Sequence, residues 1–224
     1  MSKLDKAIEA SRWVSGLTPE QRRRIEIDTV VRTVDKGGYV CRKGKPANHW
    51  IGVIDGLVKL ATMSVDGKLT TFTGVPSGGW FGEGSLLKDE PRRYDAIALR
   101  DSLIAYVPRA TFSWLLDNNN QFNRFLLLQL NERLGQFIAT VEFDRLLDPT
   151  GRIAHCLAGL FNPTLYPGTG TVLKISQEEI GHLVGLSRQR VNYSLKALEQ
   201  AGLVRVEYGG VTVLDPEGLR RFDG

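Results

Sequence analysis

The feature that most constrains the fold of this chain is an abrupt change in its sequence pattern at Pro108. From Thr29 up to that point, short runs rich in valine, isoleucine, threonine and aromatic residues are separated by glycines. Such runs predict many short strands joined by tight turns, which is typical of a β-sandwich, roll or barrel. Asp55-Gly56 and Asp66-Gly67 separate successive runs, and dipeptides of this kind indicate hairpin turns.

After Pro108 glycine becomes scarce, and the pattern favours helix. The segment Asn118–Leu147 contains one glycine, Gly135, and no proline. Apolar residues recur along it at spacings of three and four, which places them on one face of a helix. About 30 residues rising ~1.5 Å each make a rod of roughly 45 Å, and one small roll cannot easily cover so long a stripe. We therefore expect this helix to pair with its copy in a homodimer, with an ordinary core helix as the alternative. The predicted dimer stripe consists of Leu126, Leu130, Leu134, Phe137 and Val141.

The pair Asp148-Pro149 is expected to end this rod, because aspartate is a good helix cap and proline a good first helical residue. A new helix should then run to about Leu160, followed by a loop over Phe161–Gly170 that is rich in proline and glycine. The predicted domain ranges are 1–117 for a sensor roll with N-terminal helices, 118–147 for the dimerisation helix and 148–224 for the C-terminal domain.

Bulk properties bound the class of protein. Met1–Val14 lacks the apolar centre of a signal peptide and is expected to form an amphipathic helix. No run of about 18 apolar residues occurs, so no membrane span is expected. Two cysteines far apart, Cys41 and Cys156, fit a reducing cytoplasm. The net charge of +4 suggests nucleic acid, but Thr171–Gly224 carries seven basic and seven acidic residues, so charge alone does not locate a DNA site.

Two short helices around a tight turn are predicted between Ser176 and Gln200. Ser176-Gln177-Glu178-Glu179 is a capping box that opens the first helix. Gly185-Leu186 makes the turn, and Ser187 caps the second helix, whose inward residues recur at helical spacing. Strands over Leu203–Glu207 and Val211–Leu214 should then form a wing-like hairpin.

The outer face of the second helix carries side chains suited to reading DNA. Donor-rich residues at the start of an exposed second helix are what contact with base edges in the major groove requires. A plain helical hairpin with a charged solvent face is the alternative, and the capping serines, the glycine turn and the wing argue against it. The predicted DNA-binding residues are Ser176, Ser187, Arg188, Gln189, Arg190, Asn192, Tyr193 and Lys196.

Three segments, in order along the chain, resemble the Crp/Fnr family of bacterial transcription regulators. Residues 175–191 (ISQEEIGHLVGLSRQRV) resemble its helix-turn-helix, residues 147–154 (LDPTGRIA) its junction between dimer helix and DNA domain, and residues 81–84 (FGEG) its phosphate-binding cassette. The resemblance implies an α+β fold with an N-terminal β-roll (jelly-roll) sensor, a long dimerisation helix and a C-terminal winged helix-turn-helix.

The same resemblance implies a function. It suggests a homodimeric, sequence-specific regulator without enzymatic activity that binds a palindromic site, with double-stranded DNA and RNA polymerase as partners and no membrane. Ser176 and Ser187 would contact phosphates, because hydroxyls and helix N-termini hold the DNA backbone. The side chains at base-reading positions would be Arg188, Gln189, Asn192 and Tyr193.

The sensor pocket implied by the resemblance has lost part of its cyclic-nucleotide chemistry. In the family, glycine-lined amides and an arginine hold the phosphate, a glutamate takes the ribose hydroxyl, and hydroxyls on the dimer helix meet the base. Either Arg92 or Arg93 can supply the arginine, and Arg93 or Tyr94 then replaces the small hydroxyl residue that should follow. Phe137 and Ile138 stand where the base-binding hydroxyls should be. The predicted pocket residues are Gly82, Glu83, Gly84, Ser85, Arg92, Arg93, Tyr94, Phe137 and Ile138.

We therefore expect an effector of unknown identity and no tight binding of cyclic AMP in the usual pose. A different ligand, a cyclic nucleotide bound differently, and a roll kept as the scaffold of a constitutive DNA binder are the open alternatives. An iron–sulfur cluster needs about four thiolates, and two cysteines do not supply them. A lone histidine, His49, lies in the roll region, so neither haem nor the metal site of a cupin-like enzyme is expected.

Overall fold

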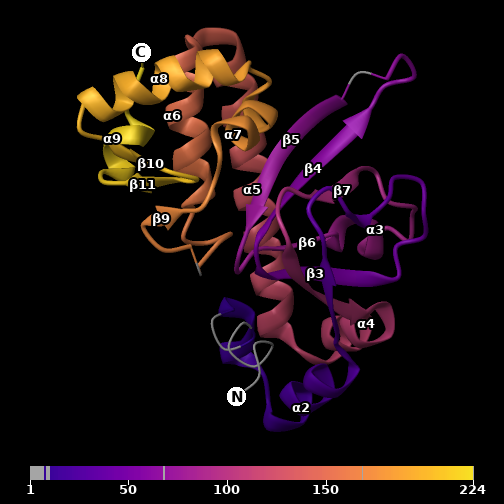
Figure 1. Ribbon diagram of the computed structural model, residues 1–224. Helices are drawn as coiled ribbons and strands as arrows, with labels where there is room; N and C mark the ends of the chain where they lie inside the picture. The colour runs from indigo at the N-terminus through magenta and orange to yellow at the C-terminus, as the bar shows by residue number, and fades with distance from the viewer. Residues whose placement is uncertain (1–7, 9–10, 68, 168, 224) are drawn as a thin grey trace. The chain divides into compact units, whose positions relative to one another are not determined.

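The structure of the protein is a computed structural model, which describes residue 8 and residues 11–67, 69–167 and 169–223. The chain forms two compact units (Figure 1). Their ranges are Met1–Glu132 with Thr164–Gly168 for the first unit, and Arg133–Pro163 with Thr169–Gly224 for the second. This division falls within the long helix, and the domain ranges 1–117, 118–147 and 148–224 stay a prediction. Most of the helix expected over Met1–Val14 lies outside the described residues, and Arg12–Gly16 forms a short 3-10 helix, η1.

The first unit contains two antiparallel four-stranded sheets, which confirms the predicted roll (Figure 1). The strands are β1 (Val30–Val34), β2 (Tyr39–Cys41), β3 (His49–Asp55), β4 (Leu57–Met63), β5 (Leu69–Pro76), β6 (Trp80–Phe81), β7 (Asp95–Ala98) and β8 (Ser102–Pro108). One sheet has the order β1-β8-β3-β6 and the other β2-β7-β4-β5. β1 and β2 are therefore edge strands of opposite sheets.

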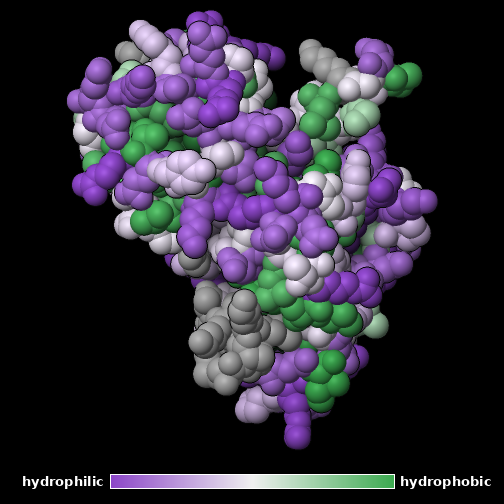
Figure 2. Space-filling model, in the orientation of Figure 1, coloured by the Kyte–Doolittle hydropathy of each residue, from purple (hydrophilic) through white to green (hydrophobic). Residues whose placement is uncertain are grey.

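Of the two predicted hairpin turns, one is confirmed and one is wrong. Asp66-Gly67 joins β4 to β5, which pair antiparallel, and Gly67 has a φ of 80°. Apolar side chains are exposed at the end of this hairpin beside polar ones (Figure 2), and they are Met63, Val65 and Leu69. Asp55-Gly56 instead joins β3 to β4, which lie in different sheets. The dipeptide encodes a tight turn there, with a φ of 119° at Gly56, but the chain changes sheet at that turn.

The space between the sheets is filled by apolar side chains from both, including Val53, Val58 and Phe81. A segment that follows the predicted helix ending near Leu160 also joins this core. Tyr166 is 1% exposed, and its hydroxyl donates a hydrogen bond of 3.1 Å to the carbonyl of Gly74. The predicted loop after Leu160 is thus part of the first unit over Thr164–Gly168.

Helices cover the other face of the β3 sheet. They are α2 (Pro19–Asp28), α4 (Arg109–Asn118) and the first turns of α5 (Asn120–Leu146). Successive residues of β3 point to opposite faces, so Ile51 lies between the sheets and Trp50 lies among the helices. Trp50 packs there with Trp13 and Trp80, at ring distances of 5.1 Å and 4.4 Å. The start of α2 is fixed locally, because Thr18 forms a capping box and proline follows it.

The long helix α5 begins at Asn120 and ends at Leu146, slightly inside the expected range 118–147. Asn119 separates it from α4, because its side chain caps the new helix by accepting from the amide of Phe122 at 2.8 Å. Leu126 is 3% exposed and packs in the core beneath the helices. Its prediction as part of a free dimer stripe is therefore wrong. None of the helices in the described ranges is long and apolar enough to cross a membrane.

The second unit contains the helical pair that the sequence predicts. Its elements are α6 (Pro149–Leu160), β9 (Val172–Leu173), α7 (Gln177–Val184), α8 (Arg188–Gln200), β10 (Val204–Glu207), β11 (Gly210–Val213) and α9 (Pro216–Arg220). Asp148 caps α6 by accepting from the amides of Thr150 and Gly151, both at 2.8 Å. The small sheet has the order β10-β11-β9, with the β10–β11 hairpin as the wing. The predicted α+β fold is confirmed.

Candidate functional site

The helix-turn-helix is built around capped helix starts and a glycine turn. Ser176 accepts from the amide of Glu179 at 3.2 Å, and the Glu179 carboxylate accepts from the amide of Ser176, so the predicted capping box is present. Gly185 ends α7 in the left-handed region, with a φ of 67°. Ser187 then caps α8 by accepting from the amide of Arg190 at 3.3 Å.

The two faces of α8 differ as the sequence predicts. Val191, Leu195 and Leu198 are buried against the rest of the unit. The opposite face is hydrophilic (Figure 2) and carries exposed polar side chains, with Tyr193 73% exposed. The predicted DNA-binding residues on it are exposed, apart from Asn192, which is half-buried. These exposed residues are Arg188, Gln189, Arg190, Tyr193 and Lys196.

Polar side chains of α6 bond this helix to its neighbours. The hydroxyl of Thr150 on α6 donates to the hydroxyl of Ser194 on α8 at 3.1 Å. Arg152, also on α6, donates to the carbonyl of Val184 at the end of α7 at 2.8 Å. The same guanidinium forms an ion pair with Asp144 of α5 at 2.9 Å. Side chains of α6 therefore bond to α8, to the end of α7 and to the end of α5.

One residue of this turn was not predicted. A Cβ placed on Gly181 of α7 would lie 2.6 Å from the carbonyl oxygen of Leu186, which is backbone and cannot easily move. The amide of Leu186 also donates to the carbonyl of Gly181 at 3.0 Å. Glycine is therefore required here for close approach of the turn to the helix. The only sequence signal is a glycine inside an amphipathic helix four residues before Gly185.

The predicted pocket residues of the first unit gather at one short helix, α3 (Glu83–Leu87). Gly82 precedes it with a φ of 91°, and Glu83 and Ser85 are buried. The positive φ favours glycine here, and a side chain at this position would displace the Arg92 guanidinium. Tyr94 packs at the edge of the core between the sheets.

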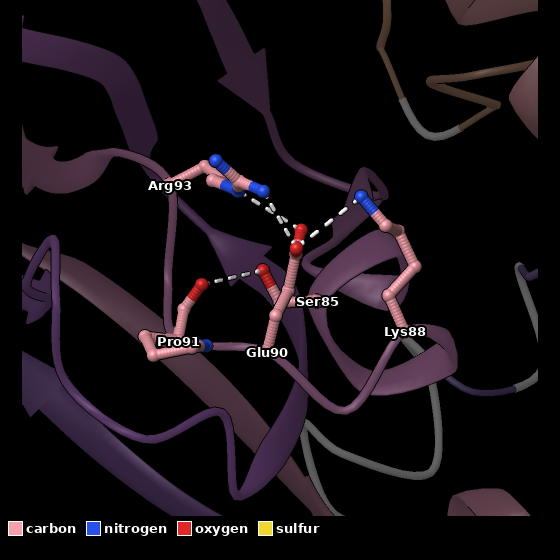
Figure 3. A network of polar contacts seen from close by, with 5 residues as sticks. All are labelled: Ser85, Lys88, Glu90, Pro91 and Arg93. Atoms are coloured by element: carbon pink, nitrogen blue, oxygen red, sulfur yellow. Dashed lines mark hydrogen bonds and ion pairs between the residues drawn. The ribbon is translucent and has the colours of Figure 1, made fainter.

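The two candidate arginines have different positions. Arg92 is 4% exposed and donates to the carbonyl of Gly82 at 2.9 Å and to the carbonyl of His49. Arg93 lies on the surface (Figure 3), where its guanidinium binds both oxygens of Glu90, at 3.0 Å and 2.7 Å. These bonds, aided by Lys88 at 3.2 Å, lower the pKa of Glu90 to about 2. Arg92 is thus the arginine inside the roll.

The remaining predicted residues lie on the distal half of α5. Phe137 and Ile138 are 39% and 60% exposed, and both belong to the second unit. Their predicted role in an effector pocket stays a prediction. Leu134 and Val141 on the same helix are exposed, whereas Leu130 is half-buried. Within the described residues, no cluster of histidine, cysteine and carboxylate side chains is placed to hold a metal ion.

Comparison with known proteins identifies both units. Residues 31–119 match the cyclic nucleotide-binding domain, and residues 151–222 match the Crp-like helix-turn-helix domain. The chain is therefore a DNA-binding transcription regulator with an effector-binding domain.

Two relatives identify the family. A CRP-like cAMP-activated global transcriptional regulator of Mycobacterium tuberculosis is 30% identical over 196 residues, which cover 83% of this chain and 84% of that protein. The cAMP-activated global transcriptional regulator CRP of Pasteurella multocida is 32% identical over 164 residues, 72% of this chain and 78% of that protein. The chain belongs to the Crp/Fnr family, whose members are transcription regulators and not enzymes.

Solved structures agree with this assignment. FixK2 from Bradyrhizobium japonicum is similar with a TM-score of 0.71 at 18% identity, over 88% of this chain and 98% of that chain, which is a likeness of fold. The catabolite activator protein of Thermus thermophilus is 26% identical with a TM-score of 0.51, over 94% of this chain and 97% of that chain.

Proposed function

We propose that the protein acts as a homodimer that binds a palindromic DNA site, with one α8 helix in the major groove of each half-site. The observation that carries this proposal is the exposed start of α8, where Arg188 and Gln189 follow the capping Ser187. A two-fold dimer matches a palindrome, because each protomer presents the same helix to one half-site. RNA polymerase would be the partner at the promoter, and the protein would work in the bacterial cytoplasm, where the genome lies.

The side chains of α8 predict which bases are read. Arg188 can donate two hydrogen bonds to O6 and N7 of guanine. Gln189 carries both a donor and an acceptor, so it suits N6 and N7 of adenine, whereas a glutamate there could only accept from cytosine. Tyr193 stands where an arginine would favour a second guanine. We therefore propose a half-site that keeps one guanine and has no strict G·C pair beside it.

Phosphate contacts would come from the two helix starts. The oxygens of Ser176 and Ser187 accept from backbone amides, so each hydroxyl hydrogen is left to donate to a phosphate. The N-termini of α7 and α8 add the favourable dipole for an anion. Arg190 and Lys196, both exposed, would add charge that does not depend on the base sequence.

A small-molecule effector would be sensed by the first unit. Gly82, Ser85 and Arg92 keep the frame of a phosphate-binding cassette, in which Arg92 is the cation available. The relatives named above are described as cAMP-activated. We propose that this chain does not bind cyclic AMP in the usual pose, because Phe137 and Ile138 offer the base no hydroxyl.

Selection of DNA from a random pool tests the DNA proposal. Wild type, Gln189→Glu and the control Gln200→Glu, which makes the same charge change at the exposed end of α8, are selected in parallel. We expect wild type and control to return one palindrome, and Gln189→Glu to return a different base at one position of each half-site. Arg188→Ala should lose ~1–3 kcal/mol of discrimination at a single base pair.

The same base preference from wild type and Gln189→Glu would show that Gln189 does not read that position. A non-palindromic product would contradict the dimeric arrangement. If the protein binds its DNA site equally well with and without cell extract as a source of effector, the alternative of a constitutive DNA binder is favoured.

A further inference from the structure

The first unit contains a cavity that the proposed function does not use. It has a volume of about 390 Å³, within the range of sites for small molecules. Its walls come from β1 and β2, the turn after β2, the start of β3, and Tyr106 of β8. Because β1 and β2 are the edge strands of opposite sheets, the cavity lies at the open side of the roll. We refer to it as the roll-mouth cavity.

The charge of the roll-mouth cavity is one-sided. Four of its lining residues are cationic and none is acidic; the cations are Arg32, Arg42, Lys45 and Arg92. Among the described residues, neither Arg32 nor Arg42 forms an ion pair with a carboxylate. Instead, the Arg42 guanidinium lies 3.9 Å from the centre of the Tyr39 ring, and that of Arg32 lies 5.8 Å from the Tyr106 ring. An arginine stacked on an aromatic face keeps its N–H edge for an anion.

The backbone places these cations together. The turn that carries Lys45 is tied to the segment of Arg92 ahead of β7, because the Arg92 amide donates to the Lys45 carbonyl at 2.9 Å and the Gly44 amide donates to the Arg92 carbonyl at 2.8 Å. His49 lines the same cavity, with its ring 5.7 Å from that of Tyr106. Burial, together with the charges of Arg92 and Arg32, lowers the pKa of His49.

The walls between the cations are apolar. Val34, Val40 and Ile51 line the inner part, so a bare inorganic ion would leave much of the cavity unused. The exposed arginines stand at the entrance and the buried Arg92 stands inside. The complementary ligand is a small organic molecule with two or more acidic groups on a compact carbon body.

We propose that the roll-mouth cavity binds a small organic polyanion, a polycarboxylate or a sugar phosphate, as a site separate from the cyclic-nucleotide cassette. The two sites share only Arg92, since Gly82, Glu83 and Ser85 do not line the cavity. The proposal does not depend on DNA binding, because the ligand would contact the first unit alone. A second ligand site in the roll would let the protein respond to a metabolite even where cyclic AMP does not fit.

Calorimetry on the full-length protein without DNA tests this proposal. Citrate, fructose 1,6-bisphosphate and pyrophosphate are titrated at one ionic strength into wild type, into Arg32→Gln/Arg42→Gln and into the control Lys36→Gln/Lys43→Gln. The control removes two exposed lysines that flank β2 and do not line the cavity. We expect at least one organic anion to bind. Its affinity should fall ~10-fold for each arginine removed and about 3-fold or less in the control.

A second measurement uses wild type alone. NMR titration should show that the bound anion raises the pKa of His49, because it offsets the charges of Arg32 and Arg92. Binding without a change at His49 would place the anion elsewhere and overturn the proposal. It would equally fail if neither citrate nor the sugar phosphate binds at millimolar concentration, if pyrophosphate binds more tightly than both, or if the control loses as much affinity as the arginine variant.

Discussion

Leu134 offers the sharpest test of the proposed dimer. It is 59% exposed on α5, and Ile138, one turn further on, is 60% exposed. Complete burial of a leucine side chain contributes ~1.5–3 kcal/mol. Covering the exposed part of Leu134, less the β-carbon that alanine keeps, should therefore contribute about 1–1.5 kcal/mol in each protomer. A two-fold interface contains the residue twice, which makes the expected cost of Leu134→Ala about 2–3 kcal/mol, or ~30- to ~150-fold in the dimer dissociation constant. Leu134→Glu should be monomeric at micromolar concentration, because it would place a carboxylate in an apolar interface.

Sedimentation at several concentrations measures this change. Leu214→Ala is the matched control, because Leu214 is 48% exposed and follows the wing strand β11. Binding to a full palindrome should fall with dimerisation, while binding to an isolated half-site should not change. If Leu134→Ala dimerises as wild type does, or if Leu134→Glu remains dimeric at nanomolar concentration, α5 does not form the interface through this stripe.

Three further outcomes are expected. Calorimetry should detect no micromolar binding of cyclic AMP that depends on Arg92, because an amine facing Phe137 and Ile138 would forfeit hydrogen bonds worth ~1–3 kcal/mol each; such binding, coupled to DNA affinity, would contradict us. Gly181→Ala should lower the melting temperature, although glycine to alanine in a helix usually stabilises by ~1 kcal/mol; an unchanged or higher value would mean that the turn relaxes freely. Tyr166→Phe should lower the free energy of unfolding by ~1–3 kcal/mol, measured with denaturant, because it leaves a buried carbonyl without its donor; a neutral effect would mean that water replaces the hydroxyl.

Features encoded within a few residues could be predicted from the sequence. The capping box at Ser176 and the cap at Asp148 satisfy their own helix ends, so no distant contact decides them. The hairpin turn at Asp66-Gly67 was predicted correctly for the same reason. Asp55-Gly56 failed because the same local turn can lead into either sheet, and only long-range pairing decides which sheet follows.

The candidate site likewise depends on contacts between residues that are distant in sequence, which local patterns do not reveal. Their positions in the sequence could not distinguish Arg92 from Arg93, because the two are adjacent and long-range contacts decide which one is buried. The choice is fixed by carbonyls of Gly82 and His49, which are distant in sequence. The roll-mouth cavity was not predicted either, since its arginines come from separate segments of the chain and have no shared motif. Leu126 was assigned to the wrong environment because periodicity defines a helix face without saying what covers it.

Because Tyr166 packs inside the roll, no single point in the sequence separates the two units. The chain passes between them at residues 132–133, 163–164 and 168–169. A sensor fragment that stops at the end of α5 would lack Leu165 and Tyr166, and would expose the apolar wall around Val75 that they cover. Proteolysis at one linker would nick the protein without releasing either part. A chimaeric protein that joins this sensor to another DNA-binding module therefore has to carry residues 164–168 with it, inserted in the foreign domain rather than attached at its end.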